Sequence, residues 1–181
     1  MDWVELAALG RANPDLVFHH QDLGSALADK QITSISRGPD GLLWIGTTSE
    51  GLLLFDAANE TIVAQYNGEA GEGGELNSPF INTVFTDSQG CAWIANGMGG
   101  LCQAMPREET PNRYAFQCHL EGMYIVDIVE MADGRLWLAA MNYGIAIFDP
   151  KTQKHELWNM ENHLNRNSVL GIEQGQNGKI W

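Results

Sequence analysis

The stretch Gly38-Pro-Asp-Gly-Leu-Leu-Trp-Ile-Gly-Thr47, followed by Gly51-Leu-Leu-Leu-Phe-Asp56, decides how this chain folds. An Asp-Gly pair leads into a short apolar run around Trp44, and a second glycine leads into a second apolar run. Asp-Gly next to such runs is typical of a β-hairpin, because both residues tolerate positive φ. The runs are too short and too often interrupted by glycine for helices, so they predict strands.

The same arrangement recurs along the 181 residues. Each copy has a tryptophan with a glycine three residues before it and β-branched residues nine and twelve before it. In the first three copies another glycine follows seven residues after the tryptophan. Fixed spacing at several positions means that one structural unit is repeated. The tryptophans that mark the copies are Trp44, Trp93, Trp137 and Trp181.

Each unit predicts four strands, which we call a, b, c and d in chain order. Strand a is the β-branched run, strand b carries the tryptophan, strand c follows the later glycine, and strand d ends in an aromatic residue. Such units are typical of a β-propeller, in which twisted sheets cover one another's faces. We expect an all-β propeller of four-stranded antiparallel blades at residues 31–66, 80–119 and 123–158, with partial blades at 1–20 and 168–181. Residues 1–12 suit a short helix equally well.

The quoted stretch resembles the two-component regulator propeller repeat, which combines Asp-Gly-x-Leu-Trp-Ile-Gly-Thr with an apolar strand ending in Phe-Asp. Ile32–Asp56 matches this pattern almost throughout, and the later copies are more degraded. The resemblance covers roughly residues 15–181. It implies a ligand-sensing, non-catalytic segment of an extracytoplasmic receptor, located in the periplasm and joined through a membrane segment to a histidine kinase or a diguanylate cyclase.

Two alternatives remain open from the residues. The turn sequence is also similar to the repeat of streptogramin lyases, propellers that use a histidine and a magnesium ion. Those lyases typically have Trp-Phe-Thr-Glu where this chain has Trp-Ile-Gly-Thr, which favours the sensor. The chain is expected to be an excerpt, because the family's rings usually have about seven blades; the other possibility is a closed four-bladed ring.

The net charge of −13 disfavours nucleic acid or an anionic membrane surface as a partner. No apolar run reaches the roughly 18 residues that a membrane helix needs. We therefore expect no nucleic-acid binding and no membrane contact by this segment. The expected partners are a small-molecule or glycan ligand and the remaining blades of a longer receptor.

Cys91 and Cys102, two of the three cysteines, fall at apolar positions of their strands. A buried thiol there acts as a small hydrophobe. In the expected register the two are diagonal neighbours with Cα atoms roughly 7–8 Å apart, which is too far for a disulfide. We expect no complete disulfide set, no Cys-x-x-Cys zinc site and no cofactor.

Candidate ligand-binding residues come from the turns. Trp44, Trp93 and Trp137 are expected to pack between blades, because they occupy the same place in every unit. Side chains that differ between copies, in b–c turns or in connections from strand d to the next strand a, suit a unique site better. No nucleophile elbow or phosphate loop occurs, so no catalytic residue or metal ligand is expected. The candidates are Glu50, Asn96, Asn142, Tyr143, His119 and His163.

Overall fold

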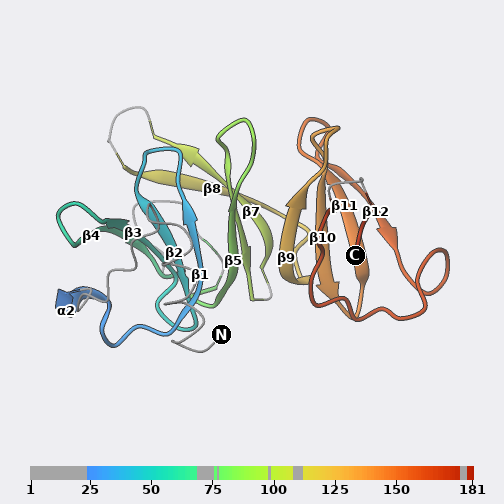
Figure 1. The fold of residues 1–181 in the computed structure, drawn as a ribbon, viewed down its shortest axis with the longest axis horizontal. Coiled ribbons are helices and arrows are strands. Elements are labelled where there is room, and N and C mark those ends of the chain that lie inside the picture. Colours follow the sequence, from blue (N-terminus) through green and yellow to red (C-terminus); the bar gives the residue numbers. More distant parts are fainter. Residues whose placement is uncertain (1–23, 69–75, 77, 98, 108–111, 176–178) are drawn as a thin grey trace, which may run out of the picture.

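The computed structural model describes residues 24–68, 76, 78–97, 99–107, 112–175 and 179–181. Within these ranges the chain forms three separate four-stranded antiparallel sheets, each with its strands in chain order. Figure 1 shows the sheets side by side in an open arc, preceded by the short helix α2 (Gly24–Leu27). The predicted all-β propeller blades are therefore confirmed.

The strand bounds are as follows. Blade 1 contains β1 (Ile32–Arg37), β2 (Leu43–Thr47), β3 (Leu52–Asp56) and β4 (Thr61–Tyr66). Blade 2 contains β5 (Ile81–Thr86), β6 (Ala92–Asn96), β7 (Gly100–Pro106) and β8 (Tyr114–His119). Blade 3 contains β9 (Tyr124–Glu130), β10 (Leu136–Met141), β11 (Gly144–Asp149) and β12 (Lys154–Trp158).

A further hairpin follows blade 3. The backbone groups of Glu173 and Trp181 exchange hydrogen bonds of 3.1 and 2.9 Å, and Gln174 forms an isolated bridge with Ile180. Ile172 is buried against blade 3, in a cluster that contains no residue of blade 1. A closed four-bladed ring would need strands from residues 1–20 beside this hairpin, so it stays a prediction. The partial blade and the alternative helix predicted within residues 1–20 lie outside the described residues.

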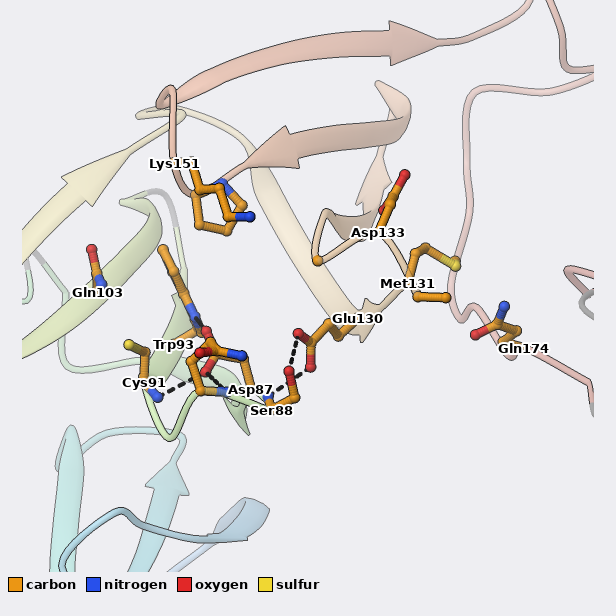
Figure 2. A pocket seen from close by; sticks show the side chains of 14 residues that line it. Asp87, Ser88, Cys91, Trp93, Gln103, Glu130, Met131, Asp133, Lys151 and Gln174 are labelled. Carbon is orange, nitrogen blue, oxygen red and sulfur yellow. Dashed lines mark hydrogen bonds between the residues drawn. The ribbon is translucent and has the colours of Figure 1, made fainter.

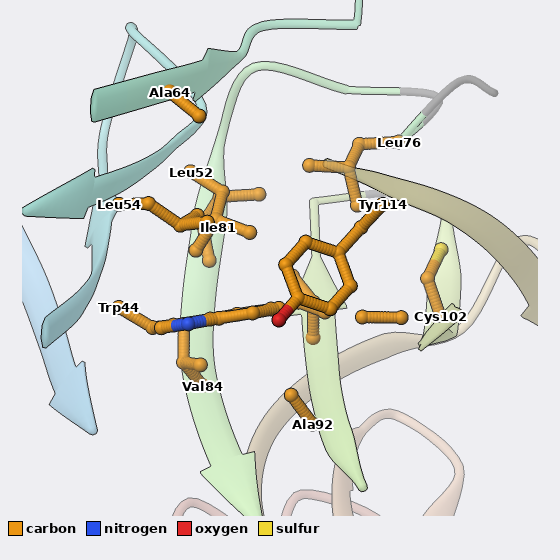
Figure 3. Close-up of a cluster of buried hydrophobic side chains, with 12 residues drawn as sticks. Trp44, Leu52, Leu54, Ala64, Leu76, Ile81, Val84, Ala92, Cys102 and Tyr114 are labelled. Carbon is orange, nitrogen blue, oxygen red and sulfur yellow. The ribbon is translucent and has the colours of Figure 1, made fainter. Parts of the chain in front are cut away.

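Alternate residues along the middle strands of a blade contact different neighbours. In blade 1, Trp44, Leu52 and Leu54 pack against Ile81 and other residues of blade 2, as Figure 3 shows. The intervening side chains of the same strands form a separate cluster with α2 on the other face. Burying each large apolar side chain contributes about 1.5–3 kcal/mol. Both faces of a blade must be covered, which explains why its two middle strands, such as β2 and β3, are apolar at consecutive positions.

Trp44 and Trp93 pack against the following blade, and Trp137 packs against the residues that follow blade 3, but the three are not buried equally. Trp44 and Trp93 are 0% and 1% exposed, which confirms that they pack between blades. Their rings meet the edges of Tyr114 and Phe148 in the next blade, at centroid distances of 4.7 and 5.7 Å. Trp137 is only half-buried, because among the described residues only a few side chains, such as Ile172 and Ile180, rather than a full sheet, lie on that side of blade 3.

Polar contacts between strand a of one blade and strand a of the next blade also repeat. The Thr33 hydroxyl donates to the carbonyl of Ile81 at 2.6 Å. The Asn82 amide, at the equivalent position of blade 2, donates to the carbonyl of Ile125 at 2.6 Å. In blade 3 the equivalent residue is Val126, which has no side-chain donor. The contact with the hairpin that follows is made instead by Asp127, whose carboxylate accepts a hydrogen bond from the Ile172 backbone at 2.9 Å.

The expectation for the cysteines was wrong for Cys102. This residue forms a disulfide with Cys118, and Cys91 is the free cysteine. Cys102 on β7 and Cys118 on β8 are direct cross-strand partners, with Cα atoms 4.0 Å apart. The sequence reasoning compared Cys102 with Cys91 on the preceding strand and missed the partner on the following one.

Candidate functional site

A cleft of about 650 Å³ lies between blades 2 and 3, within the usual size of small-molecule sites. In a sheet of consecutive hairpins, the a–b and c–d turns share one edge, which we call the ab edge. The b–c turns and the connections between blades share the opposite edge, the bc edge. The cleft is lined by residues 87–89, 91 and 131–134, which belong to a–b turns, and by Lys151 of a c–d turn. It therefore opens on the ab edge.

Asp87 organises the blade 2 side of this cleft. One carboxylate oxygen accepts hydrogen bonds from the backbone N–H groups of Gln89 and Cys91, at 3.0 and 2.8 Å. The other accepts one from Nε1 of Trp93 at 2.8 Å. In blade 1 the aspartate of the Asp-Gly turn, Asp40, binds the tryptophan Nε1 at 3.0 Å. Asp40 lies four residues before Trp44, whereas Asp87 lies six residues before Trp93. Asp87 thus takes over this role in blade 2, whose a–b turn lacks the Asp-Gly pair.

A hydrogen-bonded pair joins the two blades at the cleft. Ser88 donates to Glu130 through both its backbone N–H and its hydroxyl, at 2.7 Å each, so both Glu130 carboxylate oxygens are engaged. Figure 2 shows Gln103 and Lys151 on one side of this pair, with Asp133 and Gln174 on the other. Because Asp87 and Glu130 are committed to structural contacts, the amide and ammonium groups are the better candidates for contacting a ligand.

Two ionisable groups of the cleft have shifted pKa values. Burial, followed by the charge of Asp87, raises the pKa of the Cys91 thiol, so this cysteine is a poor nucleophile. Hydrogen bonds from the Arg135 backbone and side chain lower the pKa of Asp133, which stays ionised at neutral pH. Within the described ranges, no three His, Cys, Asp or Glu side chains are grouped closely enough to hold a metal ion.

The six candidates from the sequence do not line this cleft. Glu50 lies in the b–c turn of blade 1, paired with Lys30, and its carbonyl accepts a hydrogen bond from Gln65 at 3.0 Å. Asn142 and Tyr143 are exposed in the b–c turn of blade 3. His163, in the connection after blade 3, is exposed and packs against Trp158 with ring centroids 4.5 Å apart.

Two of the six are placed for structural roles. Asn96 is fully buried, and its amide donates to the carbonyl of Leu76 and, at 3.4 Å, to Sγ of Cys102. His119 lies at the end of β8 against Phe148 of blade 3, with ring centroids 5.1 Å apart. Its Nε2 atom is buried, and burial lowers its pKa.

The structure brings only part of the predicted set together. Gly144, next to Tyr143, donates its N–H to the carbonyl of Asn167 at 2.7 Å. This bond joins the b–c turn of Asn142 and Tyr143 to the connection that contains His163. Sequence reasoning missed Ser88, Gln103, Glu130 and Lys151, because it looked for ligand contacts on the bc edge. The available signal was that the a–b and c–d turns, which hold Ser88 and Lys151, differ between copies as the b–c turns do.

Known proteins support the fold. Residues 26–49 match the family model of the two component regulator propeller. The extracellular domain of a hybrid two component system from B. thetaiotaomicron superposes with a TM-score of 0.70 at 23% identity, over 91% of this chain and 22% of that one. A comparison with curated protein sequences gives no match.

Other propellers are similar at lower identity. PorZ, a surface component of the type-IX secretion system of Porphyromonas gingivalis, gives a TM-score of 0.62 at 17% identity, over 78% of this chain and 23% of PorZ. Virginiamycin B lyase from Staphylococcus aureus gives 0.58 at 15% identity, over 84% of this chain and 48% of the lyase. This chain thus spans less than half the length of each of these proteins. In the part of the chain that the structure describes, no helix is long and apolar enough to cross a membrane. The chain is a set of β-propeller blades that matches the two component regulator propeller model at residues 26–49 and is similar in fold to the extracellular domain of a hybrid two component system.

Proposed function

We propose that this chain is part of the ligand-sensing propeller of an extracytoplasmic signal-transduction receptor, and that this segment is not itself catalytic. The observation that carries the proposal is the two component regulator propeller repeat at residues 26–49. The fold likeness to the extracellular domain of a hybrid two component system supports it. The receptor's output domain would be a histidine kinase or a diguanylate cyclase, and a periplasmic location follows from this role. The lyase alternative has only a fold likeness at 15% identity behind it.

The cleft between blades 2 and 3 is the ligand site that the geometry supports best. Gln103 and Lys151 line it, and they come from β7 of blade 2 and from the c–d turn of blade 3. A ligand held by both would bridge two blades, so its binding would favour one spacing between them. Amide and ammonium groups suit a small molecule or glycan rich in hydroxyl or carboxylate groups.

The bc edge offers a second set of contacts. Asn142, Tyr143 and His163 are exposed there on the turn and the connection that the Gly144–Asn167 hydrogen bond joins. Glu50 stays a weaker candidate because its carboxylate is already paired with Lys30. We do not propose ligand contacts for Asn96 or His119, since burial commits both to packing.

The first test combines the sequence of the full gene with a screen of ligand classes. We expect the gene to encode a membrane segment and a kinase or cyclase domain beyond the propeller. The purified sensor domain is then heated with a panel of neutral oligosaccharides, acidic oligosaccharides, amino acids and nucleosides. At least one class is expected to raise the melting temperature. A gene that encodes only a propeller ring, together with no thermal shift from any class, would refute the proposal.

The second test locates the site with paired variants. Gln103→Ala combined with Lys151→Ala should abolish the thermal shift caused by the active compound and leave the melting temperature without ligand nearly unchanged. Asn142→Ala combined with His163→Ala is the matched control on the bc edge and should retain the shift. The reverse pattern would move the site to the bc edge while leaving the sensor function in place.

A further inference from the structure

Blades 1 and 3 share a turn arrangement built on an aspartate, and blade 2 has a different residue at that position. At the end of strand c, Asp56 accepts hydrogen bonds from the backbone of Ala58 and from the side chain of Asn59, at 2.9 and 2.7 Å. Asp149 does the same with Lys151 and the Thr152 hydroxyl, at 2.9 and 2.8 Å. We call this arrangement the aspartate cap of the c–d turn. The equivalent residue of blade 2 is Met105, which has no carboxylate.

The c–d connection of blade 2 is also longer. The capped connections comprise residues 57–60 in blade 1 and 150–153 in blade 3. In blade 2 the connection comprises residues 107–113, closed by a hydrogen bond of 2.9 Å from the Arg107 N–H to the Arg113 carbonyl. A longer loop costs more entropy to close. Closing the connection of blade 2 therefore costs more chain entropy than closing the four-residue connections of blades 1 and 3.

The disulfide joins these same two strands. Cys102 on β7 is fully buried in the cluster between blades 1 and 2, and Cys118 packs against that cluster from β8. In blade 3 the same cross-strand position is occupied by Ala146 and Leu157, and in blade 1 by Leu53 and Gln65. Among the three described blades, the covalent link thus occurs in the one without the cap.

We propose that the Cys102–Cys118 disulfide replaces the aspartate cap of blade 2 and that the domain matures in a thiol-oxidising compartment. This inference does not depend on ligand sensing. When the bond forms, the two thiols give up two protons and two electrons. The acceptor is the disulfide of a thiol–disulfide oxidoreductase, which leaves as a dithiol. Such bonds persist outside the reducing cytosol.

Counting thiols tests whether the bond exists. The chain is secreted to the bacterial periplasm, unfolded in denaturant with an alkylating reagent, and weighed by mass spectrometry. We expect one alkylated cysteine, Cys91, before reduction and three after reduction, out of the three in the sequence. Three alkylated cysteines in the unreduced protein would overturn the proposal.

Stability variants test what the bond does. Cys102→Ala combined with Cys118→Ala should lower the melting temperature by roughly 6–12 °C, the usual effect of losing a disulfide in a domain of this size. Cys91→Ala is the control and should retain the parent's stability in oxidising buffer. A double variant that melts within about 1 °C of the parent would refute a stabilising role.

Transplanting the bond tests whether it replaces the cap, and it does so even if the double cysteine variant fails to fold. Asp149→Ala removes the cap of blade 3 and should lower the melting temperature. Adding Ala146→Cys and Leu157→Cys places a cysteine pair at the matching position of β11 and β12. Oxidation should restore the melting temperature of the Asp149→Ala chain, and reduction should remove that gain. If the pair forms a disulfide but gives no gain, the proposed equivalence is wrong.

Discussion

Two sets of glycines recur in this chain, and they meet different requirements. Gly41, Gly90 and Gly134 lie in the a–b turns with φ of +82°, +81° and +81°, and a methyl group there would meet open space. The second set, in the b–c turns, also has positive φ, but its members press against the backbone at the end of strand d. These are Gly51, Gly100 and Gly144. The positive φ of the first set confirms the hairpin turns predicted from Asp-Gly.

This difference predicts unequal costs for the same substitution. Gly134→Ala should destabilise the chain by about 1–2 kcal/mol, the cost of a left-handed conformation for an alanine. Gly100→Ala should cost more than about 3 kcal/mol, because the new methyl group would also overlap the carbonyl oxygens of His119 and Leu120. Equilibrium denaturation of both variants measures the difference. Equal losses would mean that the b–c turn moves aside without cost.

The tryptophans of strand b also predict a graded effect. Trp93→Ala should cost about 3–5 kcal/mol, because the indole is fully buried and donates a hydrogen bond to Asp87. Trp137→Ala should cost less than about 3 kcal/mol, since that side chain is half-buried. Its Nε1 has no partner among the described residues, because Arg135 engages Asp133 instead. Urea denaturation of the two variants checks the order, and a larger loss for Trp137→Ala would contradict it.

At the scale of strands and turns, most of the fold was predictable from local sequence. Asp-Gly turns, glycine spacing and β-branched runs predicted the hairpins, because each depends on residues close together in the chain. The candidate cleft was not predictable in this way. The contact of Ser88 with Glu130 depends on how two blades are spaced. The pairing of Cys102 with Cys118 depends on the register across a long connection, which no nearby residue encodes.

His119, which joins strand β8 to blade 3, should make the free energy of unfolding depend on pH. Burial lowers the pKa of His119 below its ordinary value of 6.5. Between 6.5 and the lower folded pKa, the unfolded chain binds a proton that the folded chain does not. The contribution of His119 is therefore complete above about pH 6.5 and is lost as the pH falls through the folded pKa.

Denaturation at pH 7.5 and pH 5.5 measures this contribution. We expect His119→Gln to lose less stability than the parent between the two pH values, because the variant side chain does not titrate. His155→Gln changes an exposed histidine of β12 and serves as the control, with the pH dependence of the parent. A His119→Gln variant that behaves like the parent would show that His119 is accessible to solvent in the folded chain.

At the scale of the whole molecule, exposed apolar surface favours self-association of the chain and its net charge opposes it. Ile35 on blade 1 is 58% exposed, and Leu170 and Trp181 at the other end of the arc are 71% and 76% exposed. Exposed apolar side chains on sheets that pack face to face recruit partners. The net charge of −13 repels copies of the chain from one another. Salt screens this repulsion over about 10 Å at 0.1 M and leaves the apolar attraction in place.

We therefore expect the 181-residue chain to self-associate at micromolar concentration, and more strongly at 0.5 M salt than at roughly 0.05 M salt. Sedimentation velocity at the two salt concentrations measures the effect. Ile35→Asp adds a charge to one apolar end and should shift the distribution toward monomer. Val63→Asp, on outer strand β4, is the control, since that residue is 38% exposed and lies away from the inner strands. A monomer at both salt concentrations, with a cooperative melt, would show that the apolar ends do not drive association.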